Sequence, residues 1–326
     1  MAEHPLPPGY GGSDALDRRL VALLARGGTR ETIGSSRDGR PIHAYRWGEV
    51  GAPAILLVSL LHPMEWIGLE THLAMLETLL LQADPAADPT TDPAADPRAD
   101  PRADLAVDPG VGRLPAILSI PVANPDGFAR VEASLRAGRP RWVRGNAAQV
   151  DLNRNFPVGH RVRPALLTWW PFYRPGPFAL SEPETAAIAA WIERNIAERP
   201  VRLSLSLHSF GRQVFAPPAR MWRSLPGTAS MVAAAHAATA GSGYRTRQLA
   251  RWSPFFRARG TEIDFLHEAT QAPAYLVEIS GGGFGRWGAR RLMQPFCLFN
   301  APRPEREIAR ILPVLRRLAE IRGVRV

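Results

Sequence analysis

The sequence has no lysine, a single cysteine and no long apolar run. The one cysteine, Cys297, excludes both an intramolecular disulfide framework and a cysteine-rich zinc site. No uninterrupted apolar stretch reaches the roughly 18 residues that a membrane-spanning helix needs. The N-terminal segment "MAEHPLPPGYGG" lacks the basic and apolar regions of a signal peptide. We therefore expect a cytoplasmic protein without a membrane partner.

The missing lysine makes every basic side chain an arginine. Lysine and arginine total 40 against 30 acidic residues, which gives a formal net charge of +10. The arginines are scattered, and we find no compact basic run interleaved with aromatic residues as a nucleic-acid surface requires. We therefore expect no nucleic-acid partner, whereas an anionic substrate stays open.

Segments of strand and helix character alternate along the chain. The segment 52–61 is apolar almost throughout and is expected in the centre of a sheet, whereas 65–82 is predicted as an amphipathic helix. A Ser-x-x-Glu capping box is expected to begin the helix at 181–198. Other predicted strands are 41–48, 113–124, 201–211 and 272–280, and other predicted helices are 14–27, 230–241 and 304–321. This order predicts an α/β fold with a central mixed, largely parallel sheet that helices cover on both faces.

We expect a single domain at 31–326, preceded by an N-terminal extension at 1–30 with a short helix. Between residues 83 and 112 aspartate recurs every four residues, mostly as Asp-Pro. Proline at that density opposes both helix and strand, so this segment is predicted to be a disordered surface insertion without chemistry. A polar, arginine-rich loop is expected from the end of the strand at 113–124 to about residue 180.

Three polar residues lie at the ends of predicted strands: His62, His208 and Glu278. Glu65 follows His62 in the stretch "LLVSLLHPMEWIGLE" (56–70). Alone, each has an ordinary structural interpretation, such as a capping histidine or a glutamate paired with an arginine. Function gathers at the carboxyl ends of strands in such sheets, and a hydrolytic zinc site takes three protein ligands and keeps one position open. Together the residues predict a metal site, and without a His-Glu-x-x-His motif the zincin arrangement is excluded.

Seven further segments occur in a specific order along the chain. They are "ETIGSSRDGRPIHAYRWG" (31–48), "HPMEW" (62–66), "NPDG" (124–127), "RGNAAQVDLNRNFP" (144–157), "SLHSF" (206–210), "EIDF" (262–265) and "YLVEIS" (275–280). In this order the sequence resembles the zinc carboxypeptidases of the carboxypeptidase A type, from about residue 30 to 300. The style of "RGNAAQVDLNRNFP" is similar to that of bacterial members, which include murein peptide amidases.

The resemblance implies a role for each matching residue. His62, Glu65 and His208 would bind one zinc ion per chain, and Glu278 would be the base that activates the attacking water. Arg144 would polarise the scissile carbonyl and stabilise the oxyanion. Asn153 and Arg154 would hold the terminal carboxylate of a peptide substrate, because a guanidinium fork suits a planar anion.

The sequence also departs from the family pattern. Met64 stands where the family has a carboxylate-binding arginine, and Phe256 stands where it has a mobile tyrosine. Tyr244 is a candidate replacement for that tyrosine. Ile263 stands at the position of the specificity residue on the pocket floor, which would favour an apolar or neutral terminal side chain. Four further histidines are expected on the surface or on helix faces: His72, His160, His236 and His267.

Four functions are therefore considered for this sequence. The resemblance implies a carboxypeptidase that hydrolyses the C-terminal amide bond of a peptide with a free carboxylate. A murein-type amidase acting on a γ-D-glutamyl-diaminopimelate bond is weighed nearly equally, because Met64 and Phe256 fit an unusual substrate. A catalytically idle carboxylate-binding relative would not need Glu278 or Arg144. A basic nucleic-acid binder would be retained on DNA in a salt-dependent way.

Overall fold

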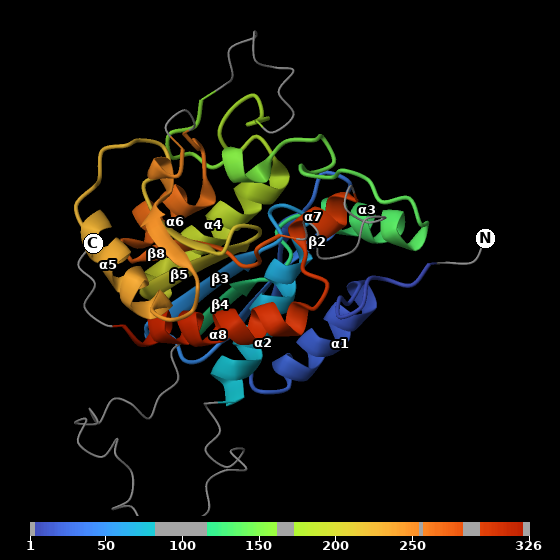
Figure 1. Cartoon of the computed structure of the whole chain (residues 1–326), viewed down its shortest axis with the longest axis horizontal. Coiled ribbons are helices and arrows are strands. Elements are labelled where there is room, and N and C mark those ends of the chain that lie inside the picture. Colours follow the sequence, from blue (N-terminus) through green and yellow to red (C-terminus); the bar gives the residue numbers. More distant parts are fainter. Residues whose placement is uncertain (1–3, 82–115, 162–172, 254–256, 283–293, 322–326) are drawn as a thin grey trace, which may run out of the picture.

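The computed structural model describes residues 4–81, 116–161, 173–253, 257–282 and 294–321 (Figure 1). The predicted insertion at 83–112 lies outside these residues. Within them, eight strands form one sheet in the order β1-β2-β4-β3-β5-β8-β6-β7. The strands are β1 (Thr29–Ser35), β2 (Pro41–Trp47), β3 (Ala54–Ser59), β4 (Ala116–Ile120), β5 (Val201–His208), β6 (Gln213–Ala216), β7 (Arg245–Gln248) and β8 (Ala274–Glu278).

The centre of the sheet is parallel and its flanks bring in antiparallel pairs. β4, β3, β5 and β8 pair in parallel, whereas β2 pairs antiparallel with β4 and β6 pairs antiparallel with β8. All six residues of β3 are buried, as expected for a strand covered on both faces. The predicted α/β class with a mixed, largely parallel sheet is therefore confirmed.

Helices cover both faces of the sheet (Figure 1). On one face α1 (Ser13–Leu24), α2 (Trp66–Leu81), α5 (Thr228–Thr239) and α8 (Pro304–Glu320) share an apolar core with the sheet. On the other face α4 (Pro183–Glu198) and α6 (Glu262–Thr270) pack over a second core. The shorter elements are α3 (Pro125–Arg136), α7 (Pro295–Phe299) and the 3-10 turns Leu152–Arg154 and Leu249–Arg251. Among the helices of the described residues, none combines the length and the apolarity that crossing a membrane requires.

The N-terminal helix α1 packs against α2. Arg19 of α1 makes ion pairs with Glu70 and Glu77 of α2, at 2.6 and 2.8 Å. The predicted division of the chain at residue 30 stays a prediction.

Several local predictions were wrong. Twelve of the sixteen residues of α2 are buried, so this helix is enclosed rather than amphipathic. The predicted capping box of α4 does not form, because Glu182 is the N-cap residue and its side chain makes no capping hydrogen bond. The loop expected up to residue 180 contains α3, which begins at Pro125 beside the N-cap side chain of Asn124. The N-cap oxygen accepts a hydrogen bond from Gly127 N at 2.9 Å.

His72 lies in the core and not on the surface. It is fully buried on α2, and its Nδ1 and Nε2 lie 2.9 Å from Ser59 Oγ and 2.8 Å from Ser119 Oγ. Ser59 donates its own hydroxyl hydrogen to the Pro121 carbonyl. Ser59 must therefore accept from Nδ1–H, and the neutral ring then accepts from Ser119 at Nε2. Burial lowers the pKa of His72 to about 3.

Candidate metal centre

The parallel strands bring three predicted residues to one edge of the sheet. β3, β5 and β8 are parallel neighbours, so their carboxyl ends lie together. His208 ends β5 and pairs with Glu278 at the end of β8. His62 follows the end of β3, after Leu60 has turned the chain with a φ of 54°. A positive φ at a leucine is uncommon and places the backbone under local strain beside the site.

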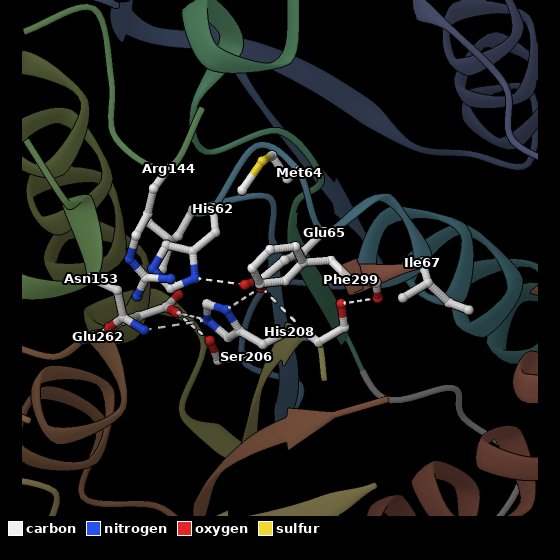
Figure 2. Close-up of polar contacts among 12 residues, drawn as sticks. His62, Met64, Glu65, Ile67, Arg144, Asn153, Ser206, His208, Glu262 and Phe299 are labelled. Carbon is white, nitrogen blue, oxygen red and sulfur yellow. Dashed lines mark hydrogen bonds and ion pairs between the residues drawn. The ribbon is translucent and has the colours of Figure 1, made fainter. Parts of the chain in front are cut away.

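His62, Glu65 and His208 converge in a buried cluster (Figure 2). Glu65 Oε1 lies 2.9 Å from His62 Nδ1, and Glu65 Oε2 lies 2.8 Å from His208 Nδ1. One ligand atom from each residue lies within 4.8 Å of the others. Two imidazoles and a carboxylate are the donor set of a hydrolytic zinc site, and the residues present fit that metal.

The electrostatics of the cluster keep Glu65 ionised. Burial alone would raise the pKa of Glu65, but the charges of His62 and His208 and their hydrogen bonds lower it to about 2. Burial alone would lower the pKa of His208, whereas the charge of Glu65 and its hydrogen bond raise it. A carboxylate that stays ionised at neutral pH is ready to bind a cation.

Asp151 contacts the His62 ring on the side opposite the other two ligand residues. Its Oδ1 lies 3.0 Å from His62 Nε2, on the side of the ring away from Glu65. Its Oδ2 accepts from Arg144 Nε at 2.9 Å, and Oδ1 accepts from Asn153 N at 3.0 Å. Burial would raise the pKa of Asp151, but the Arg144 guanidinium and then the His62 charge hold it well below its usual value. A carboxylate on the outer nitrogen of a ligand histidine fixes the orientation of its ring.

Glu278 completes the charged part of the site. Its Oε2 is buried and has no hydrogen-bond partner among the described residues. Burial, and then the negative charge of Glu65, raise the pKa of Glu278 to about 8. Glu278 lines the same cavity as the metal cluster. A carboxyl group with a free oxygen at this place is suited to exchange a proton with a bound molecule.

A cavity of about 300 Å³ lies over this cluster. The residues predicted from the sequence that line it are His62, Glu65, Arg144, Asn153, Arg154, His208 and Glu278. Asn153 Oδ1 accepts from Glu262 N at 2.9 Å, so its amide nitrogen is the part that faces other groups. That nitrogen lies 3.4 Å from His208 Nε2. Phe210, Phe215 and Phe299 supply apolar walls.

Met64 faces the loop that carries Arg144 (Figure 2). The side chain is 1% exposed, and its sulfur accepts from Val143 N at 3.3 Å. Asn300 Nδ2 donates to the Met64 carbonyl at 2.7 Å. Met64 is not among the described residues that line the cavity, so it supports the wall next to Arg144 and does not replace the family arginine as a ligand group.

The other predicted substrate contacts have different outcomes. Phe256 lies outside the described residues. Ile263 of α6 is fully buried in the second core and is not among the described lining residues, so its place at the pocket floor stays a prediction. Tyr244 is also unsuited to its predicted role, because it is buried and its hydroxyl donates to the Ile279 carbonyl.

The sequence reasoning assigned no role to four residues at this site: Asp151, Glu262, Thr261 and Gln213. Asp151 precedes Asn153 by two residues and caps the 3-10 turn, a local pattern that indicates a capping residue but not its contact with His62. Glu262 lies 4.0 Å from His208 Nε2 and accepts from Ser206, and burial raises its pKa to about 7. Thr261 and Gln213 line the cavity, and only the folded chain brings them there.

The sequence is similar to known zinc carboxypeptidases. The sequence profile of the zinc carboxypeptidase family matches residues 111–300. Carboxypeptidase A6 of Mus musculus is 26% identical over 191 residues, which cover 55% of this chain and 42% of that protein. The chain spans less than half the length of the curated relatives that it matches.

Solved structures share the fold. Bovine thrombin-activatable fibrinolysis inhibitor, in complex with tick carboxypeptidase inhibitor, matches with a TM-score of 0.67 and 17% identity over 95% of this chain and 96% of that chain. Carboxypeptidase A from Helicoverpa armigera matches with a TM-score of 0.64 and 20% identity over 96% of this chain and 75% of that chain.

Proposed function

Because the chain belongs to the zinc carboxypeptidase family, we propose that it is a zinc-dependent carboxypeptidase that hydrolyses the C-terminal amide bond of a peptide. The observation that carries the proposal is the meeting of His62, Glu65 and His208 with the unsatisfied Glu278 carboxyl at one cavity. Binding alone needs no buried carboxyl of raised pKa beside a metal cluster, which argues against an idle relative.

His62, Glu65 and His208 would hold the metal. When bound, zinc supplies a Lewis acid that polarises the scissile carbonyl and lowers the pKa of a water molecule. Asp151 keeps the His62 ring in place through Nε2, so that Nδ1 points toward the other two ligands.

Glu278 is the proton carrier of the proposal. It would take a proton from the attacking water and then deliver that proton to the nitrogen of the leaving amine. Register pairs Glu278 with His208, so the base and the ligand sit on adjacent, rigid strand ends. A pKa of about 8 without metal places the group in the range where it can both accept and release a proton near neutral pH.

Arg144 would contact the carbonyl oxygen of the reacting amide, and the Asn153–Arg154 pair would hold the terminal carboxylate of the substrate. Arg144 donates its Nε hydrogen to Asp151, and this contact orients the guanidinium group. Its terminal nitrogens would then bind the carbonyl oxygen as that oxygen gains negative charge. Burial would lower the pKa of Arg144, but Asp151 and then Glu65 raise it, so the group stays cationic. Asn153 and Arg154 line the same cavity and suit a planar carboxylate.

The test is the Glu278→Gln substitution, with Glu132→Gln as a matched control. Glu132 is a buried glutamate that pairs with Arg136 and is not among the residues that line the cavity. We expect Glu278→Gln to keep one zinc per chain by metal analysis and to lose hydrolysis by about 10²- to 10⁴-fold, the usual contribution of a general base. The control should keep both.

The substrate is part of the same assay. Parent protein is offered an acyl-peptide with a free C-terminus and, separately, a γ-D-glutamyl-diaminopimelate peptide, each with and without a chelator. Faster cleavage of the second peptide would favour the murein-type amidase. Zinc-loaded parent that cleaves neither peptide, or a Glu278→Gln variant as fast as the parent, would refute the proposed function.

A further inference from the structure

A second cavity of about 650 Å³ adjoins the metal centre and is larger than the cavity over it. It is lined mainly by the C-terminal half of α3 and the segment that follows, residues 130–149, together with Arg174. We call this second cavity the groove. Arg144 lines both cavities, so the groove begins at the residue that would polarise the scissile carbonyl. Its volume lies in the range of cavities that hold drug-sized ligands.

The groove is strongly basic. Its arginines are Arg130, Arg139, Arg141, Arg144 and Arg174, and no aspartate or glutamate is among the described residues that line it. The sequence places Arg136, Arg139, Arg141 and Arg144 within nine residues around Trp142, and folding adds Arg130 and Arg174. The expectation of scattered arginines therefore does not hold at residues 136–144, where the charge is concentrated around one aromatic residue.

Within the described residues, only part of this charge is neutralised by ion pairs. Arg130 pairs with Asp38 at 2.9 Å, and Arg144 pairs with Asp151 at 2.9 Å. Arg174 donates to the neutral amide oxygen of Gln149 at 2.6 Å. Arg139 and Arg141 are exposed and form no ion pair with any described residue. Arg139, Arg141 and Arg174 have no counter-charge among the described residues, and three such cations along one groove attract an anion of extended shape.

The part of a peptide that would lie in the groove follows from the residues beside it, and this step rests on the proposed function. Asn153 and Arg154, which would hold the terminal carboxylate, line the metal cavity and are absent from the described lining of the groove. A peptide held by them, with its scissile carbonyl at Arg144, would continue on its amino side into the groove. Trp142 lies there too, 42% exposed and edge-on to Phe299 of the metal cavity at 5.5 Å.

We propose that this groove binds acidic residues of the substrate on the amino side of the cleaved bond, so that the protein prefers acidic peptides. Carboxylates match guanidinium groups in planar, two-bonded geometry. Removing one exposed charge of this kind weakens an interaction by about 1.4- to 5-fold, so Arg139 and Arg141 together account for about 2- to 25-fold.

The kinetic test uses two peptides that differ only in charge, acetyl-Glu-Glu-Glu-Ala-Phe and acetyl-Gln-Gln-Gln-Ala-Phe. For the parent we expect kcat/KM to favour the glutamate peptide by about 2- to 25-fold at low salt, and the ratio to fall as salt screens the charges. Arg139→Gln/Arg141→Gln should bring the ratio close to one, and the corresponding double lysine variant should retain most of it. The matched control is Arg306→Gln/Arg310→Gln on α8, which changes the same number of exposed arginines outside the groove and should keep the parental ratio.

A binding test separates this proposal from the proposed function. Fluorescein-labelled versions of both peptides are titrated with chelator-treated protein, and fluorescence anisotropy reports affinity without hydrolysis. Tighter binding of the glutamate peptide that Arg139→Gln/Arg141→Gln weakens by about 2- to 25-fold supports the groove even if no peptide is cleaved. Equal affinity for both peptides in the parent overturns it, whether or not hydrolysis occurs. A single-stranded oligonucleotide that binds more tightly and displaces the glutamate peptide also overturns it, in favour of a nucleic-acid site.

Discussion

Asp151→Asn gives the sharpest test of how the metal centre is built. The substitution keeps the size and one acceptor oxygen of the side chain but removes its negative charge. Asp151 is 2% exposed and contacts His62 Nε2 at 3.0 Å, Arg144 Nε at 2.9 Å and Asn153 N at 3.0 Å. The variant therefore leaves a largely buried arginine without its counter-charge and a ligand histidine without its anionic support.

Two magnitudes follow from these contacts. Breaking a buried ion pair by removing one partner costs about 3–5 kcal/mol, and this should appear in the free energy of unfolding of the metal-free protein. Losing the outer support of a ligand histidine lowers metal affinity by about 10- to 100-fold, or roughly 1.4 to 2.7 kcal/mol. The assays are urea unfolding in chelator and zinc titration against a competing chromogenic chelator.

Asp264→Asn is the matched control. Asp264 is also buried, accepts from Ala219 N at 2.8 Å and lies 3.5 Å from Arg220, but it does not contact the metal cluster. The control should lose stability and keep the parental zinc affinity. If Asp151→Asn binds zinc as tightly as the parent, or if Asp264→Asn loses as much zinc affinity, then Asp151 does not position His62 and the reasoning fails.

Two further predictions concern α2. His72 has its pKa lowered to about 3 by burial, so its neutral form stabilises the folded state above the unfolded pKa near 6.5 and this stabilisation is lost as the pH falls. The unfolding free energy of the parent should therefore fall relative to that of His72→Gln by about 2 kcal/mol between about pH 7.5 and pH 5, measured by urea unfolding; parallel pH profiles would contradict this. In Gly68→Ala the new Cβ would lie 2.8 Å from the Leu207 carbonyl oxygen, next to His208, so α2 and β5 must separate. We expect a loss of about 1–3 kcal/mol in thermal unfolding together with weaker zinc binding, and a variant more stable than the parent would refute the close contact.

The sequence predicted the fold class because the strands in its centre are apolar on both faces and alternate with helices. The apolar run "AILLVS" of β3 favoured a strand covered on both sides, and all six of its residues are buried. Capping and amphipathic character were predicted less well, because they depend on neighbours. α2 carries His72 and Glu70, which look polar in the sequence but find partners in Ser59, Ser119 and Arg19 from other elements. Tertiary hydrogen bonds thus decide which polar residues can be buried.

At the site, the predicted strand ends identified His62, His208 and Glu278 with Glu65 beside His62, and the family resemblance added Arg144, Asn153 and Arg154. The structure brings all seven to one cavity. Spacing did not identify what surrounds them. The side chain of Ile263 lies in the second core, while Glu262 beside it faces Ser206 and His208. Adjacent residues on a helix point about 100° apart, so Glu262 faces His208 while Ile263 faces the core.

The sequence by itself determined that His62, His208 and Glu278 stand at the carboxyl ends of strands, where function gathers in a parallel sheet, and that Glu65 lies close to His62. Only the tertiary structure decided the environment that gives those residues their chemistry. Asp151 reaches His62 across 89 residues of sequence, and Arg174 joins residues 130–149 in the basic groove. Such contacts form only when loops that are far apart in the sequence pack together over the sheet. Local sequence patterns do not record that packing or the charge pairs within it.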